Sequence, residues 1–427
     1  MTQEERKLKR ERDTKKAFIT LTGLICIVIA LGAAAVFGIK LFMDKKEMIS
    51  NNQPTTETQK ESENGTTEQP TEKPVIDPLT QEAITIVTGM TTEQKVAQMF
   101  VITPDALTGT QGATVVGNTT KQAYANYPVG GLIYEKNNFK TAEQTKAMLD
   151  AMKTLSIESV ALPIFLGVEE EGGKASVIAS TSPLDVANIE DMNVVGASGD
   201  AAKAYEAAAT IGTYLSDLGF NLNLAPMADV LTNESNTALK ERSFGSDSTV
   251  VSDMTVSALQ GLKEKGIYGV VKHFPGQGAT IGDSRKGAVS TDKTLEELMA
   301  CELIPFQNAI ASGAEFIMAG HIAVPGITGN TVPASLSEYM ITQVLRTEMG
   351  YKGIIITDAM NVKAITESYD SGQAAIEAIN AGVDMILMPS DFKAAYDAVL
   401  GAVKNGTISE ERINSSLVRI VKTKLGM

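Results

Sequence analysis

The chain has 427 residues, of which 43% are hydrophobic and 21% are charged, and this composition excludes wholesale disorder and collagen-like structure. Its net charge of −14 at pH 7 would repel phosphate backbones, so no nucleic-acid partner is expected. With two cysteines and two histidines, the sequence offers no cysteine zinc site and few histidine ligands, so we expect no metal and no cofactor.

The first residues form a basic segment followed by an apolar one. Residues 1–16, the predicted cytoplasmic tail, contain seven Lys or Arg and four acidic residues. Residues 17–39 then continue without a charge and are long enough to span a bilayer as one helix. The basic excess before them predicts a single-pass protein of the cell membrane, with the N-terminus cytoplasmic and the rest extracytoplasmic. A cleaved signal peptide is the alternative, but no small-residue cleavage site follows the apolar segment.

Residues 40–77 are predicted to be a flexible linker. From residue 48 onward this segment consists largely of Asn, Gln, Thr, Glu, Pro, Ser and Lys. Such a composition buries too little apolar surface to offset the entropy lost on ordering. We therefore expect the folded domain to begin near residue 78 and to continue to residue 427.

Residues 78–427 contain eight short apolar runs of about strand length, separated by helix-like stretches. The runs are 99–102, 131–134, 163–168, 220–225, 268–271, 316–319, 353–356 and 385–388. This alternation predicts an α/β protein with a (β/α)₈ TIM-type barrel. A doubly wound sheet is the second choice, because no glycine-rich dinucleotide fingerprint follows the first run. Two helices are also predicted, at 201–218 between Asp200 and Gly219 and at 337–349 before Gly350.

Polar residues follow these runs at their C-terminal ends, which is the end where barrels of this kind place their reacting groups. They are glutamates 169–171, Asp229, Lys272, His273, His321, Asp358 and Ser390. The pattern predicts a polar pocket at one mouth of the barrel.

Each polar residue also has a plainer interpretation. Asp358 could be a catalytic carboxylate or only the N-cap of a following helix. His321 could contact a substrate or be a buried, hydrogen-bonded histidine. Glutamates 169–171 could be a solvated run, although the glycines after them favour at least one pointing into the mouth. Lys272 and His273 are costly to bury unless an anionic or hydroxyl-rich group meets them.

Several motifs in the same order resemble one known family. Residues 272–276 read Lys-His-Phe-Pro-Gly and are followed by Asp283 and Ser284. Further matching segments are 90–100, 130–133, 169–174, 241–245, 317–321, 353–358 and 381–385. The set resembles glycoside hydrolase family 3, in particular the single-domain β-N-acetylhexosaminidases that remove N-acetylglucosamine from peptidoglycan fragments. The resemblance covers residues from about 90 to 427.

The resemblance implies a retaining mechanism and a carbohydrate partner that contains N-acetylglucosamine. Asp358 matches the family nucleophile, which forms a covalent glycosyl ester. Asp283 matches the carboxylate of the catalytic Asp-x-His dyad. The substrate-binding positions match Arg242, Lys272, His273, His321 and Glu169, the last at the place of a sugar-binding Asp.

The sequence departs from the family at that dyad, which reads Asp283-Ser284-Arg285. Arginine stays protonated and cannot act as the acid or the base. No spare histidine exists, because His273 and His321 match other family positions. One hypothesis is a membrane-anchored glycosidase with a replacement acid, drawn from glutamates 169–171 or from another chain. The other is an inactive barrel that binds cell-wall glycans as a sensor or scaffold.

Overall fold

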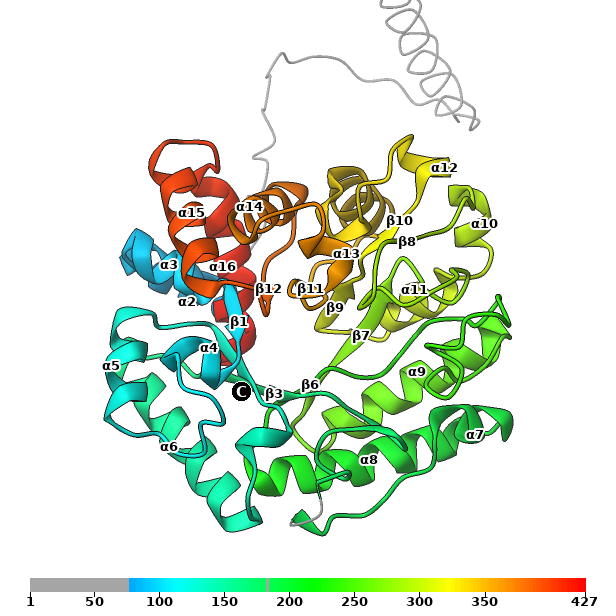
Figure 1. Ribbon diagram of the computed structural model, residues 1–427, viewed down its shortest axis with the longest axis horizontal. Coiled ribbons are helices and arrows are strands. Elements are labelled where there is room, and N and C mark those ends of the chain that lie inside the picture. Colours follow the sequence, from blue (N-terminus) through cyan, green and yellow to red (C-terminus); the bar gives the residue numbers. More distant parts are fainter. Residues whose placement is uncertain (1–76, 182–183) are drawn as a thin grey trace, which may run out of the picture. The chain divides into compact units, whose positions relative to one another are not determined.

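The computed structural model describes residues 77–181 and 184–427 (Figure 1). The predicted cytoplasmic tail (1–16), membrane helix (17–39) and all but the last residue of the linker (40–77) lie outside these residues. Among the residues that are described, no helix is both long enough and apolar enough to cross a membrane.

The core of the domain is a sheet of eight parallel strands in the order β11-β9-β7-β6-β3-β2-β1-β12. An isolated parallel bridge between Ile356 and Met385 joins the two ends of the sheet. Neighbours in the sheet are therefore neighbours in the chain, as in the predicted (β/α)₈ barrel and unlike a doubly wound sheet. The strands are β1 (Phe100–Ile102), β2 (Gly131–Ile133), β3 (Phe165–Val168), β6 (Leu222–Asn223), β7 (Tyr268–Phe274), β9 (Phe316–Ala319), β11 (Ile354–Thr357) and β12 (Ile386–Leu387).

Each predicted apolar run overlaps one of these strands, but β7 is longer than predicted. The sequence places Lys272 and His273 after the fifth strand, whereas the structure places both inside it. The pairing register of β7 with β9 shifts between Val271 and Phe274, which marks a local bulge. Such a bulge re-aims side chains, and here it lies at the two residues with the most unusual polarity for a strand.

Helices surround the sheet and connect its strands (Figure 1). They are α2 (Pro78–Gly89), α3 (Thr92–Gln98), α4 (Pro104–Thr108), α5 (Asn118–Asn126), α6 (Ala142–Val160), α7 (Met192–Ala197), α8 (Ala201–Leu218), α9 (Ser248–Lys263), α10 (Leu295–Met299), α11 (Ile304–Ala311), α12 (Pro325–Thr328), α13 (Lys363–Thr366), α14 (Ser371–Ala381), α15 (Phe392–Lys404) and α16 (Glu410–Leu425). Shorter or unusual helical segments are η1 (Lys136–Asn138), η3 (Ala334–Leu336) and η4 (Tyr339–Glu348).

The predicted helix at 201–218 is α8. The Asp200 side chain accepts a hydrogen bond from the Ala202 N–H, and Gly219 ends the helix in the left-handed region at a φ of 103°. The helix predicted at 337–349 is η4, which begins two residues later and has π-helical hydrogen bonding.

Two small sheets lie outside the barrel. β4 (Glu170–Gly172) pairs with β5 (Ala175–Ser176), and β8 (Val289–Ser290) pairs with β10 (Ile322–Ala323). Both follow barrel strands on their C-terminal side, so they extend the wall of the mouth.

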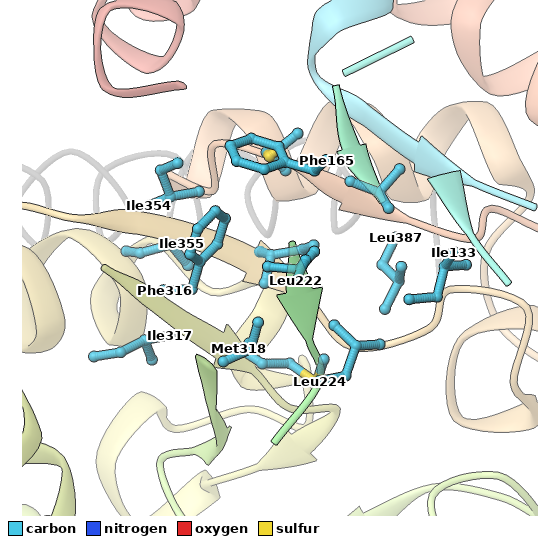
Figure 2. Packing of buried hydrophobic residues seen from close by; sticks show 14 of the residues in the cluster. Ile133, Phe165, Leu222, Leu224, Phe316, Ile317, Met318, Ile354, Ile355 and Leu387 are labelled. Carbon is cyan, nitrogen blue, oxygen red and sulfur yellow. The ribbon is translucent and has the colours of Figure 1, made fainter. Parts of the chain in front are cut away.

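Apolar side chains of the strands fill the barrel interior (Figure 2). The rings of Phe165 and Phe316 meet edge to face with their centroids 5.2 Å apart. Leu222, Met318 and Leu387 are buried in the same cluster. Because the interior is packed with hydrocarbon, the barrel is not a pore, and its polar groups gather at the C-terminal mouth.

Candidate active site

The C-terminal mouth of the barrel contains a pocket of about 260 Å³. Its wall includes five of the predicted site residues, which come from the ends of β3, β7 and β11 and from two loops: Glu169, His273, Asp358, Arg242 and Asp283. Arg285 and Glu135 also line it. Lys272 and His321 are almost wholly buried behind this wall.

Asp358 follows β11 directly, and its carboxylate lines the pocket. Its Oδ1 accepts a hydrogen bond of 2.7 Å from the Ala359 N–H. No helix begins here, since α13 starts at Lys363 with Val362 as its N-cap, so the N-cap interpretation does not apply. Burial alone raises the pKa of Asp358, but electrostatic interactions with His273 and His321 and the Ala359 hydrogen bond outweigh it and lower the pKa. The pocket therefore holds an ionised carboxylate at neutral pH.

His273 is oriented by a buried carboxylate. Its Nδ1 lies 2.7 Å from Oδ2 of Asp229, a fully buried residue. The other oxygen of Asp229 accepts from the backbone N–H groups of His273, at 3.3 Å, and of Gln277, at 2.6 Å. A carboxylate on Nδ1 places the proton on that nitrogen, which leaves Nε2 as the acceptor of the ring. The sequence placed Asp229 at a strand end but gave it no role.

Lys272, Glu169, Glu171 and Arg242 form one ion cluster beside the pocket. The buried ammonium of Lys272 lies 2.5 Å from Glu169 Oε1 and 2.6 Å from Glu171 Oε1. Arg242 donates to both oxygens of Glu171, at 2.8 Å from Nε and 2.5 Å from Nη2. Burial raises the pKa of Glu171, but the two cations outweigh it and hold the pKa well below its ordinary value. Lys272 thus acts on the pocket through Glu169, whose side chain is 48% exposed.

The glutamates of 169–171 are not a solvated run, because Glu170 and Glu171 are buried. Successive residues alternate in direction, as in a strand. Glu170 accepts from the Tyr214 hydroxyl at 2.7 Å and from the N–H groups of Ile178 and Ala179. Only Glu169 of the three lines the pocket, which agrees with the expectation that at least one points into the mouth.

His321 does not line the pocket and is buried, as in the plainer interpretation of this residue, and a substrate contact for it stays a prediction. Its Nδ1 lies 2.8 Å from the Ser335 hydroxyl and its Nε2 lies 3.1 Å from the Ala359 carbonyl oxygen. Both ring nitrogens are therefore occupied by protein partners, and burial lowers the pKa of His321. The residue instead fixes the backbone next to Asp358.

Asp283 is held by its own loop. Arg285 donates from its backbone N and from Nε to Oδ1, at 3.0 and 2.9 Å, and from Nη2 to Oδ2 at 2.9 Å. The Arg285 hydrogen bonds lower the pKa of Asp283 despite the opposing effect of burial. A carboxylate in such a fork stays ionised and is a poor proton donor. Asp283 and Arg285 thus form an ion pair at the edge of the pocket.

A barrel with an ionised carboxylate, an oriented histidine and an ion cluster of lysine, arginine and glutamates at its C-terminal mouth has the features of a glycoside-processing enzyme. Residues 91–423 match the Glycosyl hydrolase family 3 N terminal domain, and the chain belongs to this family. The predicted family resemblance is confirmed.

Individual relatives agree with this assignment. The chain is 31% identical over 321 residues to a protein named Beta-hexosaminidase A from Pseudoalteromonas piscicida, a match that covers 70% of this chain and 54% of that protein. It is 30% identical over 307 residues to an uncharacterized secreted glycosyl hydrolase from Arthroderma benhamiae, covering 68% of this chain and 83% of that protein. The solved structure of a family 3 β-N-acetylglucosaminidase from Paenibacillus sp. superposes with a TM-score of 0.73 at 33% identity, covering 79% of this chain and 62% of that one.

Proposed function

We propose that this protein is a membrane-anchored, extracytoplasmic β-N-acetylhexosaminidase of the retaining type, with Asp358 as its nucleophile. The observation that carries the proposal is the ionised Asp358 carboxylate at the end of β11, in the wall of a pocket. A nucleophile must be charged and positioned at the moment of attack, and the lowered pKa of Asp358 and its place in the pocket wall support this role. The relatives named β-hexosaminidase and β-N-acetylglucosaminidase support the sugar class.

The size of the pocket supports action on a terminal sugar. Its volume of about 260 Å³ lies below the range of about 300–1,000 Å³ that drug-sized ligands occupy. The pocket shares Glu169, Arg242 and Arg285 with an adjoining cavity of about 300 Å³, so one sugar ring fits beside Asp358 and the next unit of a glycan can lie in the adjoining cavity. N-acetylglucosamine at the end of a peptidoglycan fragment is the substrate we propose.

The chemistry proceeds in two displacements. An oxygen of Asp358 attacks the anomeric carbon as the bond to the leaving oxygen breaks, and a covalent glycosyl ester forms. Water then attacks the same carbon and releases Asp358. Arg242 and His273 are placed to hold sugar hydroxyls, and the carboxylate of Glu169 is placed as an acceptor for them. Orientation by such groups lowers the barrier because the ring is held for in-line attack.

A second candidate function rests on the Asp283–Arg285 ion pair. If no other residue supplies the proton, the barrel would bind cell-wall glycans without cleaving them, as a sensor or scaffold. This alternative predicts saturable binding of N-acetylglucosamine oligomers with no release of monosaccharide.

The two functions are separated by incubating the full-length protein in detergent with a disaccharide-peptide from peptidoglycan. We expect release of N-acetylglucosamine by the natural chain and none by Asp358→Asn, because the amide of the variant is not a nucleophile. Binding of the substrate by both forms without any release would overturn the glycosidase in favour of the silent barrel.

A further inference from the structure

Hydrolysis in this pocket requires a proton donor, and four carboxyl residues among the described residues line it: Glu135, Glu169, Asp283 and Asp358. Three of them are committed to other partners or another task. Glu169 lies 2.5 Å from the buried Lys272 ammonium, so protonating it would leave that charge with one partner fewer. Asp283 is held in the fork of Arg285, and Asp358 is the nucleophile of the proposed mechanism.

We propose that Glu135, at the C-terminal end of β2, is the general acid and base of this pocket. The proposal deepens the glycosidase function above and rests on it. Unlike Glu169 and Asp283, Glu135 forms no ion pair within the described residues. Glu135 lines the pocket and is only partly buried, so the leaving group of a bound sugar can reach its carboxyl group.

The backbone around Glu135 is fixed. The Tyr134 N–H donates to the Gly167 carbonyl at 2.9 Å and continues the pairing of β2 with β3. The Glu135 N–H donates to Oδ1 of the buried Asn138 at 2.9 Å. In the ring of strands, β1 and β12 separate β2 from β11. Glu135 and Asp358 therefore approach the pocket from different sides, as the two carboxyl groups of a glycosidase must flank the scissile bond.

A neighbouring carboxylate favours the protonated form of Glu135. Asp105 in α4 accepts from the N–H groups of Gly112, at 2.6 Å, and Ala113, at 3.0 Å, and from Nδ2 of Asn138 at 3.3 Å. Asn138 thus bridges the Asp105 carboxylate and the Glu135 backbone. Burial, and after it the charge of Asp105, raise the pKa of Glu135 above its ordinary value. A raised pKa is what a carboxylic acid needs in order to donate at neutral pH.

The proton balance of the two steps is complete with this residue. In the first step the Glu135 proton moves to the leaving oxygen while Asp358 bonds to the anomeric carbon. In the second step the Glu135 carboxylate takes a proton from water, whose oxygen displaces Asp358 from the same carbon. Glu135 ends protonated and Asp358 ends as a free carboxylate.

The test uses the full-length protein in detergent with Glu135→Ala and two N-acetylglucosaminides. A dinitrophenyl leaving group departs without proton assistance, whereas the alcohol of chitobiose does not. We expect Glu135→Ala to lose about 10²–10⁴ in kcat/KM on chitobiose but to keep a rapid first release of dinitrophenol. Azide, which needs no general base, should restore turnover and yield the glycosyl azide. Glu143→Ala, an exposed change in α6 outside the pocket, is the matched control and should behave as the natural chain.

A merely structural role for Glu135 would slow both substrates alike and give no glycosyl azide, which would overturn the proposal. Unchanged chitobiose hydrolysis by Glu135→Ala, with Asp358→Asn inactive, would overturn it while leaving the glycosidase function intact. If the natural chain releases nothing from either substrate, both proposals are wrong.

Asp105→Asn tests the electrostatic argument separately. The general acid works only while protonated, so kcat/KM falls as pH rises through the Glu135 pKa. Removing the Asp105 charge lowers that pKa, and the alkaline limb of the pH profile should move to lower pH. An alkaline limb at the same pH as in the natural chain would show that Glu135 is not the titrating acid.

Discussion

His273 and Asp229 show how one buried carboxylate prepares a pocket residue. Asp229 accepts from the ring and from the backbone of His273, so the tautomer and the orientation of the imidazole are both fixed. An imidazole whose Nδ1 carries the proton can accept a sugar hydroxyl only at Nε2. Asp229, which had no predicted role, therefore orients His273, which was predicted to bind the substrate.

Asp229→Asn removes this control with little change in shape. The amide can keep the bond from the Gln277 N–H through its oxygen, but its NH₂ group cannot accept from Nδ1–H. We expect kcat/KM for the dinitrophenyl glycoside to fall by about tenfold or more, since the wrong tautomer is favoured. Asp200→Asn, an N-cap change to an equally good cap, is the control and should leave kinetics unchanged. Equal kcat/KM values for Asp229→Asn and the natural chain would contradict this role.

The limits of sequence reasoning are clearest at single residues. Asp358, Glu169 and His273 were found because each follows or ends an apolar run, and the structure places all three in the pocket wall. His321 also follows an apolar run, yet both of its ring nitrogens are paired with the protein, one with the Ser335 hydroxyl and one with the Ala359 carbonyl. Strand-end position predicts which end of the barrel a residue occupies, but not whether its polar atoms are already paired by the protein.

Glu135 was missed although it carries the same signal, since it directly follows the apolar run at 131–134. No family motif included it, and one exposed glutamate before Lys136 looks like ordinary surface. Its distinguishing features are the shared pocket and the charge of Asp105, which is 30 residues earlier in the chain. Neither can be read from a linear pattern.

At the scale of elements, the barrel strands were predictable because each must be apolar on both faces. Parallel strands covered by helices read as hydrophobic runs, and the eight runs did so, although the fourth is interrupted by Asn221 and Asn223. The extension of β7 through Lys272 and His273 was not predictable, since the burial of these groups depends on Glu171 and Asp229. The sheet of β4 and β5 was missed for the same reason: Glu-Glu-Gly is a poor strand sequence until its carboxylates find partners.

Asp384 shows how a single buried charge joins elements. It is fully buried just before β12, and its carboxylate pairs with Arg346 in η4 and, at 2.9 Å, with Arg419 in α16. It also accepts from the Ile355 N–H of β11 at 2.9 Å. One carboxylate therefore connects β11, η4 and α16 at the point where the two ends of the eight-stranded sheet meet.

Asp384→Asn should destabilise the domain by about 3 kcal/mol or more, because it leaves partly buried guanidinium groups without a counter-charge. Asp150→Asn is the matched control, since its pairs with Lys146 and Lys153 span 3.7 Å and its side chain is 51% exposed. Removing those pairs should change stability by about 1 kcal/mol or less. Denaturant unfolding of the two variants measures the difference, and equal midpoints would show that Asp384 does not connect the elements as described.

At the scale of the whole molecule, the barrel positions the site, and the N-terminal segment is predicted to determine where the site is used. The apolar run at 17–39 lies outside the described residues and stays a prediction. If it anchors the chain, full-length protein should sediment with membranes after a carbonate wash, and added protease should digest the barrel of intact, wall-stripped cells. Deletion of residues 1–39 should move the protein to the soluble fraction. Full-length protein that is already soluble would contradict the anchor.

We predict that Asp358 forms a covalent bond to the sugar during turnover. The most direct measurement is rapid quenching of the full-length protein with dinitrophenyl N-acetylglucosaminide, followed by digestion and mass analysis of the peptides. We predict one sugar on the peptide that contains Asp358, lost in Asp358→Asn. Dinitrophenol release without a sugar on that peptide, or the same adduct in the variant, would contradict the assignment of the nucleophile.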